Sequence, residues 1–114
     1  MKDLSKIKCA PCSTGVGLLS PEEIDTLADQ ITGWRIVKNH HLAKEYKTSE
    51  FADGLEWVNR VGALAEKEGH HPDIELSWGR VAIKLTTHDA GGLTRNDFIL
   101  AAKIDRLKPP GKRP

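Results

Sequence analysis

The sequence predicts an α+β domain, in which a four-stranded antiparallel sheet has helices packed on one face, in the order α-β-β-α-β-β-α. Two observations predict it. Segments in which apolar residues recur every three or four positions alternate with pairs of short segments in which every second residue is apolar. Short turn sequences join the members of each pair, as in antiparallel hairpins. At 114 residues the chain has the length of one such layered domain.

The first helix is predicted to begin at Pro21 and to end before Gly33. Ser20 is a favourable N-cap, proline suits the first helical position, and Glu23 completes a capping box with Ser20. The apolar stripe of this helix consists of Ile24, Leu27 and Ala28. Start and stop signals therefore bracket the helix on both sides.

A first hairpin is predicted after this helix, with strands over residues 34–38 and 41–46. In both strands the large apolar residues lie two or four positions apart, which places them on one face of a strand. The turn between the strands is predicted at Asn39-His40, because asparagine is favoured in tight turns.

A long helix is predicted from Thr48 or Ser49 to about Glu68. Gly69 follows it in the usual position of a left-handed cap residue. Apolar residues at helical spacing predict the face that packs on the sheet. These residues are Phe51, Leu55, Val58, Val61, Leu64 and Ala65.

A second hairpin and a last helix complete the domain. Residues 73–77 and 81–86 alternate apolar and polar side chains, and Trp78-Gly79 is the predicted turn between them. A loop follows at 87–92, and Thr94 with Asp97 is predicted to cap the last helix. The apolar stripe of that helix consists of Phe98, Ala101, Ala102 and Ile104.

The charge of the chain is nearly balanced, with 17 Lys and Arg against 16 Asp and Glu. Residues 1–8 carry a charge of +2 and residues 103–114 carry +4, so residues 9–102 carry −5. Because the positive charge falls at the ends, we expect no basic groove and no nucleic-acid partner. No run approaches the ~18 apolar residues of a membrane span, and residues 1–8 lack the apolar core of a signal peptide. We expect no membrane partner and a cytoplasmic location.

The two ends of the chain are predicted to lie outside the folded domain. Residues 1–17 show no periodicity and are expected to form a flexible arm, residues 18–107 the domain, and residues 108–114, with three prolines and a glycine, a disordered tail. Cys9 and Cys12 lie in the arm. Their spacing is that of half a zinc knuckle or of a redox pair, but no second pair accompanies them, so incidental thiols are the preferred interpretation.

Three of the five histidines are expected at one end of the second hairpin. His70 and His71 precede its first strand and His88 follows its second, and antiparallel pairing brings these ends together. Pro72 favours an extended backbone at His71, so the adjacent imidazoles would flank different parts of one ligand. Because imidazole gives and takes a proton near neutral pH, the cluster is a candidate acid–base site.

Other interpretations of the histidines stay open. A histidine in a loop is most often solvated, and His40 and His41 in the predicted turn are interpreted in this way. The set His70, His71 and His88 also suggests Zn²⁺ with an open coordination position. Adjacent ligands in an extended chain rarely converge on one ion, however, and we expect no metal.

Two carboxylates lie close to this cluster in the sequence. Asp97 is a candidate to orient a histidine in addition to its ordinary role as a cap residue. Glu66 precedes His70 by four residues, so it either faces that ring across the helix end or is a solvated surface charge.

Residues 65–73 (AEKEGHHPD) and 81–97 (VAIKLTTHDAGGLTRND) contain an HHP motif, a THxxxGLT motif and a following aspartate. In order and spacing these elements resemble the pterin-4a-carbinolamine dehydratase family. The resemblance extends from about Leu18 to about Leu107 and implies the fold predicted above. Cysteines before the first helix also occur in bacterial-type members.

The resemblance implies dehydration of a 4a-hydroxytetrahydropterin, such as 4a-hydroxytetrahydrobiopterin, to the quinonoid dihydropterin and water. This reaction recycles the pterin cofactor of aromatic amino-acid hydroxylases. The resemblance also implies histidine catalysis without metal or bound cofactor, and a homodimer or homotetramer. The implied catalytic residues are His70, His71 and His88. The implied substrate-binding residues are Glu66, His70, His71, Pro72, Thr87, His88, Asp89 and Asp97.

Within this reaction we expect His70 and His88 to lie nearest the departing hydroxyl group and to give it a proton. His71 is expected to position the pterin ring, and Asp97, with Glu66, to orient imidazoles. The alternative is a pterin-binding regulatory or protein-dimerisation module without significant turnover. The complete acid–base set favours the enzyme.

Overall fold

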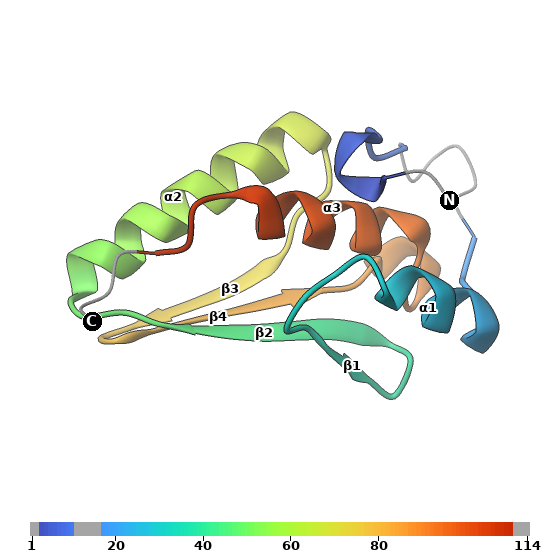
Figure 1. The fold of residues 1–114 in the computed structure, drawn as a ribbon, viewed down its shortest axis with the longest axis horizontal. Helices are drawn as coiled ribbons and strands as arrows, with labels where there is room; N and C mark the ends of the chain where they lie inside the picture. Colours follow the sequence, from blue (N-terminus) through green and yellow to red (C-terminus); the bar gives the residue numbers. More distant parts are fainter. Residues whose placement is uncertain (1–2, 11–16, 111–114) are drawn as a thin grey trace.

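The computed structural model describes residues 3–10 and 17–110. Four strands form one antiparallel sheet in the order β1-β2-β4-β3, and α1, α2 and α3 all lie on the same side of it (Figure 1). The predicted fold class and element order are confirmed. The elements are η1 (Leu4–Lys6), α1 (Pro21–Ala28), β1 (Arg35–Val37), β2 (His41–Lys47), α2 (Phe51–Glu68), β3 (Asp73–Ser77), β4 (Arg80–Leu85), η3 (His88–Ala90) and α3 (Arg95–Arg106).

The two hairpins differ in how well their turns were predicted. The β3–β4 turn is Trp78-Gly79 as predicted, with Gly79 at a φ of 76°. The β1–β2 turn begins one residue earlier than predicted, because Lys38 and Asn39 are the residues with positive φ, both at 53°. The N–H of His40 closes this turn by donating to the carbonyl of Val37 at 2.8 Å.

α2 ends at Glu68 as expected but begins at Phe51, two or three residues later than predicted, and its buried face matches the prediction only in part. Gly69 follows the helix with a φ of 70°, the left-handed cap. Phe51 and Leu55, predicted to pack on the sheet, are 45% and 44% exposed. Val61 and Ala65 are buried as predicted, and the packed face also contains Gly54, where a Cβ would lie 2.8 Å from Leu76. Its buried residues are Gly54, Trp57, Val61, Ala65 and Glu68.

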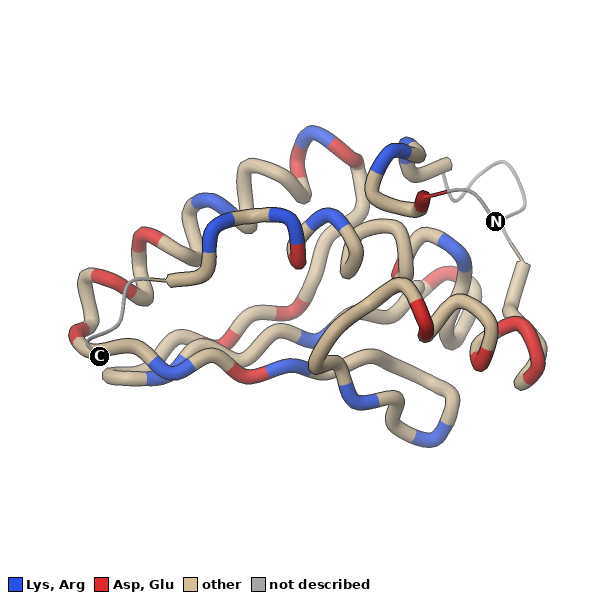
Figure 2. Tube along the Cα trace, viewed as in Figure 1, with Lys and Arg blue, Asp and Glu red and all other residues tan. Residues whose placement is uncertain are grey.

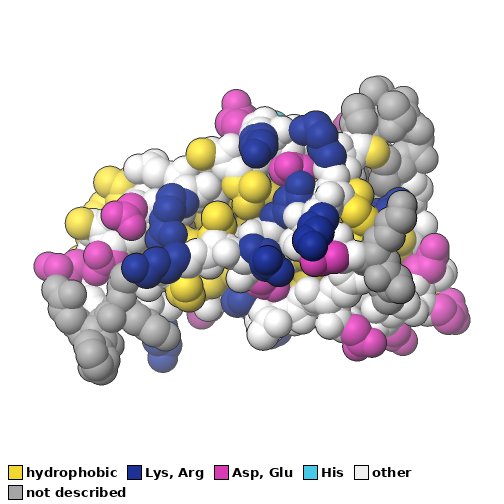
Figure 3. Space-filling model, turned by 45° about the horizontal axis from the view of Figure 1, so that its top comes forward, with side chains coloured by type: hydrophobic (Ala, Val, Ile, Leu, Met, Phe, Trp, Pro, Cys, Tyr) yellow, Lys and Arg dark blue, Asp and Glu magenta, His cyan; other side chains and the backbone are white. Residues whose placement is uncertain are grey.

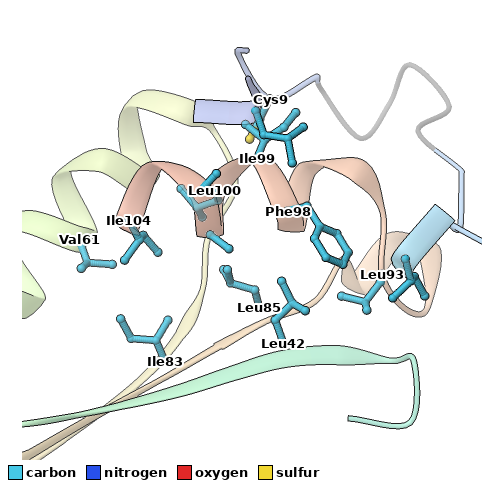
Figure 4. Close-up of a cluster of buried hydrophobic side chains, with 14 of the residues drawn as sticks. Cys9, Leu42, Val61, Ile83, Leu85, Leu93, Phe98, Ile99, Leu100 and Ile104 are labelled. Carbon is cyan, nitrogen blue, oxygen red and sulfur yellow. The ribbon is translucent and has the colours of Figure 1, made fainter. Parts of the chain in front are cut away.

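The hydrophobic core lies between α3 and the centre of the sheet. Phe98, Leu100 and Ile104 of α3 face Leu42, Ile83 and Leu85 of β2 and β4 (Figure 4). Both capping boxes are present: Glu23 accepts from the N–H of Ser20 at 2.8 Å, and Asp97 accepts from the N–H of Thr94 at 2.9 Å. Asp97 is also one of the predicted site residues. The contact between Thr94 and Asp97 therefore belongs both to the N-terminus of α3 and to the candidate site.

Residues 3–10 pack on the domain and do not form the flexible arm that was predicted. Leu4 and Cys9 are buried in the core, and the N–H of Leu4 donates to Oε1 of Gln30 at 2.8 Å. The segment carries no periodic pattern because it is anchored by single side chains from distant elements. Residues 1–2 and 11–16, with Cys12, lie outside the described residues.

The positive charge at the chain ends also belongs in part to the folded surface. Lys103 and Arg106 are residues of α3, and Lys6 is a residue of η1. Basic residues lie along α3 and the N-terminal segment, whereas acidic residues lie along α1 (Figure 2). On the helical face, Lys and Arg side chains gather over α2 and α3 (Figure 3). Lys103 and Arg106 lie within the predicted domain of residues 18–107, whereas Lys6 lies in the segment that was predicted to be a flexible arm.

The start of the predicted disordered tail also contacts the domain. Nη1 of Arg60 donates to the carbonyl of Lys108 at 2.8 Å, and Pro110 is buried. Residues 111–114 lie outside the described residues. Over the described part of the chain, every helix is too short or too polar to cross a membrane.

Candidate active site

A cavity of about 420 Å³ lies where α2 ends and where β4 leads into η3. The β3–β4 register pairs Asp73 with Lys84, so the residues after α2 return beside the residues after β4. The structure thereby brings together the three histidines that the sequence singled out. The lining residues are Gly69, His70, His71, Thr86, Thr87, His88 and Asp89.

Each histidine of the cavity has a carboxylate of its own. Because an ionised carboxylate only accepts hydrogen bonds, a histidine bonded to one donates through the ring nitrogen in contact. In the two close pairs this nitrogen is Nε2, which leaves Nδ1 to exchange a proton with a ligand. The pairs are His70 Nε2 with Asp97 Oδ1 at 2.6 Å, His71 Nε2 with Glu66 Oε2, and His88 Nε2 with Asp73 Oδ2 at 3.7 Å.

The pair of His70 and Asp97 is buried, and both carboxylate oxygens of Asp97 accept hydrogen bonds. The side chain of His70 is 6% exposed and that of Asp97 is 0% exposed. The second carboxylate oxygen, Oδ2, accepts from the hydroxyl of Thr87 at 2.8 Å and from the N–H of Thr94 at 2.9 Å. Because the hydroxyl of Thr87 donates its proton to Asp97, it can only accept from the hydroxyl of Thr94, which lies at 2.7 Å. Every proton in this network has an acceptor, which fixes the position and tautomer of His70.

The other two pairs lie at the surface. The side chains of His71 and His88 are 61% and 71% exposed. Glu66 contacts His71 and not His70, and its exposed side chain agrees with the second alternative given for it, a surface charge. Asp73 was not among the predicted site residues. Asp73 could have been predicted from the strand register, because it is the first residue of β3 and lies beside the end of β4 that leads to His88.

The remaining predicted residues divide between the cavity and its surroundings. Thr87 and Asp89 line the cavity, whereas Pro72 does not. The hydroxyl of Thr87 is committed to Asp97, so this residue supports the buried pair. The sequence did not single out Gly69 and Thr86 as lining residues, because neither side chain carries acid–base chemistry.

A family model described as pterin 4 alpha carbinolamine dehydratase matches residues 17–107. The chain belongs to the pterin-4a-carbinolamine dehydratase family. A protein of Rubrobacter xylanophilus, provisionally named pterin-4-alpha-carbinolamine dehydratase, is 48% identical over 94% of this chain and 100% of its own length. A protein of Alkaliphilus metalliredigens with the same provisional name is 47% identical over 93% of this chain and 96% of its own.

Two solved structures resemble this dehydratase-family fold. The crystal structure of a transcriptional coactivator/pterin dehydratase from Brucella melitensis matches with a TM-score of 0.70 and 26% identity, over 76% of this chain and 94% of that one. A pterin dehydratase-like protein identified as a RuBisCO assembly factor in the alpha-carboxysome matches with a TM-score of 0.54 and 26% identity, over 67% of this chain and 89% of that one. The fold is thus shared by proteins whose titles state different roles.

The side chains of this dehydratase-family member offer no grouped metal ligands within residues 3–10 and 17–110, where no three His, Cys, Asp or Glu are placed to hold an ion. The imidazoles of the cavity instead face separate carboxylates. Burial, together with the nearby charge of Glu68, raises the pKa of the Cys9 thiol to about 12, so this sulfur stays protonated and unreactive at neutral pH. Cys9 therefore functions as a core residue.

Proposed function

We propose that this chain catalyses the dehydration of a 4a-hydroxytetrahydropterin, such as 4a-hydroxytetrahydrobiopterin, to the quinonoid dihydropterin and water. The observation that carries the proposal is one cavity lined by three imidazoles, each beside its own carboxylate. The volume of about 420 Å³ lies in the range of small-molecule pockets. Membership of the dehydratase family supports the choice of substrate.

The reaction needs a proton donor and a proton acceptor and no redox partner. The 4a-hydroxyl group leaves as water after its oxygen receives a proton, N5 gives its proton to solvent water, and the C4a–N5 single bond becomes a double bond. We assign His70 and His88 to the proton transfer at the departing oxygen and His71 to positioning of the ring. Asp97 supports this assignment, because it occupies Nε2 of His70 and leaves Nδ1 for the substrate.

The proposal extends to the biological setting of the reaction. We propose that the chain recycles the pterin cofactor of an aromatic amino-acid hydroxylase in the cytoplasm, as a homodimer or homotetramer. Support for an oligomer comes from two apolar side chains one helical turn apart on the exposed face of α2, because contiguous exposed apolar patches mark association sites. Phe51 and Leu55 lie on α2, and Trp78, in the β3–β4 turn, is 73% exposed.

The decisive test is turnover of 4a-hydroxytetrahydropterin generated in situ by a phenylalanine hydroxylase, followed by absorbance of the quinonoid product. The wild type is expected to exceed the spontaneous rate. His70→Ala and His88→Ala should each lower turnover by about 10²–10⁴-fold. His40→Ala, in the β1–β2 turn, is the matched control and should leave turnover unchanged. A loss below about threefold in both site variants would exclude the assignment.

A second candidate function is a regulatory or assembly module that binds pterin or a protein without significant turnover. This candidate is supported by the two structural neighbours, of which one is described as a transcriptional coactivator/pterin dehydratase and the other as a RuBisCO assembly factor. The same assay separates the two candidates. Pterin binding measured by fluorescence, without acceleration of the dehydration, would support the module and exclude the enzyme.

A further inference from the structure

Asn96, the residue before Asp97 in α3, holds the N-terminal segment by both ends of its side-chain amide. Its Oδ1 accepts from the N–H of Ala10 at 2.9 Å, and its Nδ2 donates to the carbonyl of Ala10 at 2.6 Å. Asn96 is 1% exposed. The thiol of Cys9 adds a weak contact to the carbonyl of Asn96 at 3.7 Å. The first turn of α3 is thus tied to residues 9 and 10.

The end of α2 is tied to the same short segment. Oε1 of Glu68 accepts from the N–H of Cys9 at 2.9 Å, while its Oε2 accepts from Lys103 of α3 at 2.8 Å. The ammonium group of Lys8 donates to the carbonyl of Lys67 at 2.9 Å. We call residues 8–10 the N-terminal clasp, because they bond to the last turn of α2 and to the first turn of α3.

Both anchor points of the clasp lie directly beside the buried pair of the candidate site. Glu68 precedes His70 by two residues, with the cap residue Gly69 between them. Asn96 is the immediate neighbour of Asp97. The pair therefore joins the same two backbone segments that the clasp joins, and the distance from His70 Nε2 to Asp97 Oδ1 is 2.6 Å. A shift of either segment would change that distance.

We infer that the N-terminal clasp is a positioning element, which holds the end of α2 and the start of α3 at the separation at which His70 donates to Asp97. Asn96 and Glu68 are its positioning residues. The inference rests on the proposed function, because it assigns a catalytic consequence to this separation. A small displacement of a reacting group is enough to lower turnover strongly. A segment that does not line the cavity would then control the chemistry of the cavity.

The test compares Asn96→Ala, which removes both bonds to Ala10, with Gln30→Ala. The second variant removes the bond to Leu4 and so loosens the same N-terminal segment away from the site. We expect Asn96→Ala to lower kcat by about tenfold to a hundredfold, with KM within about twofold of wild type. Gln30→Ala should lower the urea midpoint but leave kcat unchanged.

A spectroscopic readout tests the positioning directly. The imidazole proton between His70 and Asp97 should give a low-field proton resonance in wild type and in Gln30→Ala. We expect this resonance to shift or disappear in Asn96→Ala. If Asn96→Ala does not fold, Ala10→Pro, at an exposed residue, removes the backbone donor to Asn96 and should change the resonance in the same direction.

The outcomes separate this inference from the proposed function. A lower urea midpoint in Asn96→Ala with unchanged kcat and an unchanged resonance would make the clasp a structural anchor only and would overturn the inference. If the wild type shows no turnover, the proposed function fails, but the resonance still tests whether the clasp positions the pair of His70 and Asp97. Its loss in Asn96→Ala and its retention in Gln30→Ala would show that the clasp positions the pair.

Discussion

The candidate site has a buried half and an exposed half, and they are built on different principles. In the buried half, which consists of His70, Asp97, Thr87 and Thr94, every hydrogen-bonding proton has an acceptor inside the protein. In the exposed half, His71 pairs with Glu66, and His88 lies near Asp73, with all four side chains more than half exposed. Low dielectric strengthens the first set, whereas water screens the second.

This difference shows how one cavity combines fixed and adjustable groups. The buried half can hold an imidazole at one position and in one tautomer before any ligand arrives, because moving it would leave polar groups unpaired. The exposed half is free to adjust to a ligand at small cost. Substitutions of the carboxylates in the two halves should therefore differ in their effects on both stability and turnover.

The largest effect is expected for Asp97→Asn. The amide keeps the shape but cannot accept from His70, Thr87 and Thr94 together, so a buried network loses its acceptor. We expect the free energy of unfolding to fall by about 3 kcal/mol and turnover to fall by about 100-fold. Urea unfolding and the dehydratase assay measure the two quantities. Wild-type values for both would show that the buried half is not fixed by this carboxylate.

An intermediate effect that depends on pH is expected for Glu68→Gln, next to the buried half. Burial raises the pKa of Glu68, but the bonds from Lys103 and the Cys9 N–H, with the charges of Lys103 and Lys8, lower it more, so it lies below its usual 4.5. A carboxyl group with a lowered pKa contributes stability above its unfolded pKa and loses it as pH falls through the folded pKa.

At pH 7 we expect Glu68→Gln to lower the free energy of unfolding by about 2 kcal/mol. Below pH 4.5 the difference from wild type should shrink as the wild-type carboxylate gains its proton. Urea unfolding at several pH values between 7 and 3 measures it. A difference that is the same at every pH would contradict the ion pair with Lys103. Glu66→Gln, in the exposed half, is the control and should show little pH-dependent change.

A smaller effect is expected for Thr87→Val, which leaves the hydroxyl of Thr94 without its acceptor and Asp97 with one donor fewer. We expect the free energy of unfolding to fall by about 1 kcal/mol and turnover to fall by less than about tenfold. Thr87→Ser restores the hydroxyl and should recover most of both losses. If the serine variant behaves like the valine variant, the network contributes less than the packing of the methyl group.

The smallest effects are expected for the two carboxylates of the exposed half. Glu66→Gln and Asp73→Asn should change the free energy of unfolding by no more than about 0.5 kcal/mol, because water screens exposed ion pairs. We expect a higher KM for the pterin, with kcat within about threefold of wild type. A loss of kcat as large as that of Asp97→Asn would remove the distinction between the two halves.

Much of the fold could be predicted because its signals are local. The capping box of Ser20 and Glu23, the left-handed cap at Gly69 and the turn at Gly79 each depend on residues within four positions of one another. The convergence of the three histidines followed from one hairpin. These features need only backbone geometry and short-range hydrogen bonds, which a sequence displays directly.

Other features depend on contacts that have no local signal. The long helix carries apolar residues on more than one face, and only packing against the sheet decides that Trp57 is buried while Phe51 is exposed. The partner of Glu66 is His71 because of the direction in which the chain leaves Gly69. The N-terminal segment is held by Glu68 and Asn96, whose distance from it in sequence exceeds fifty residues.

By itself, then, the sequence determined the layered fold, the helix ends capped by Ser20, Gly69 and Thr94, the histidine motif and the family to which the chain belongs. The tertiary structure alone decided which carboxylate faces each imidazole, which half of the site is buried, and that the N-terminal segment joins α2 to α3. The physical reason is that helices, turns and caps are stabilised by neighbours along the chain. Burial and long-range hydrogen bonds exist only once distant segments have packed together.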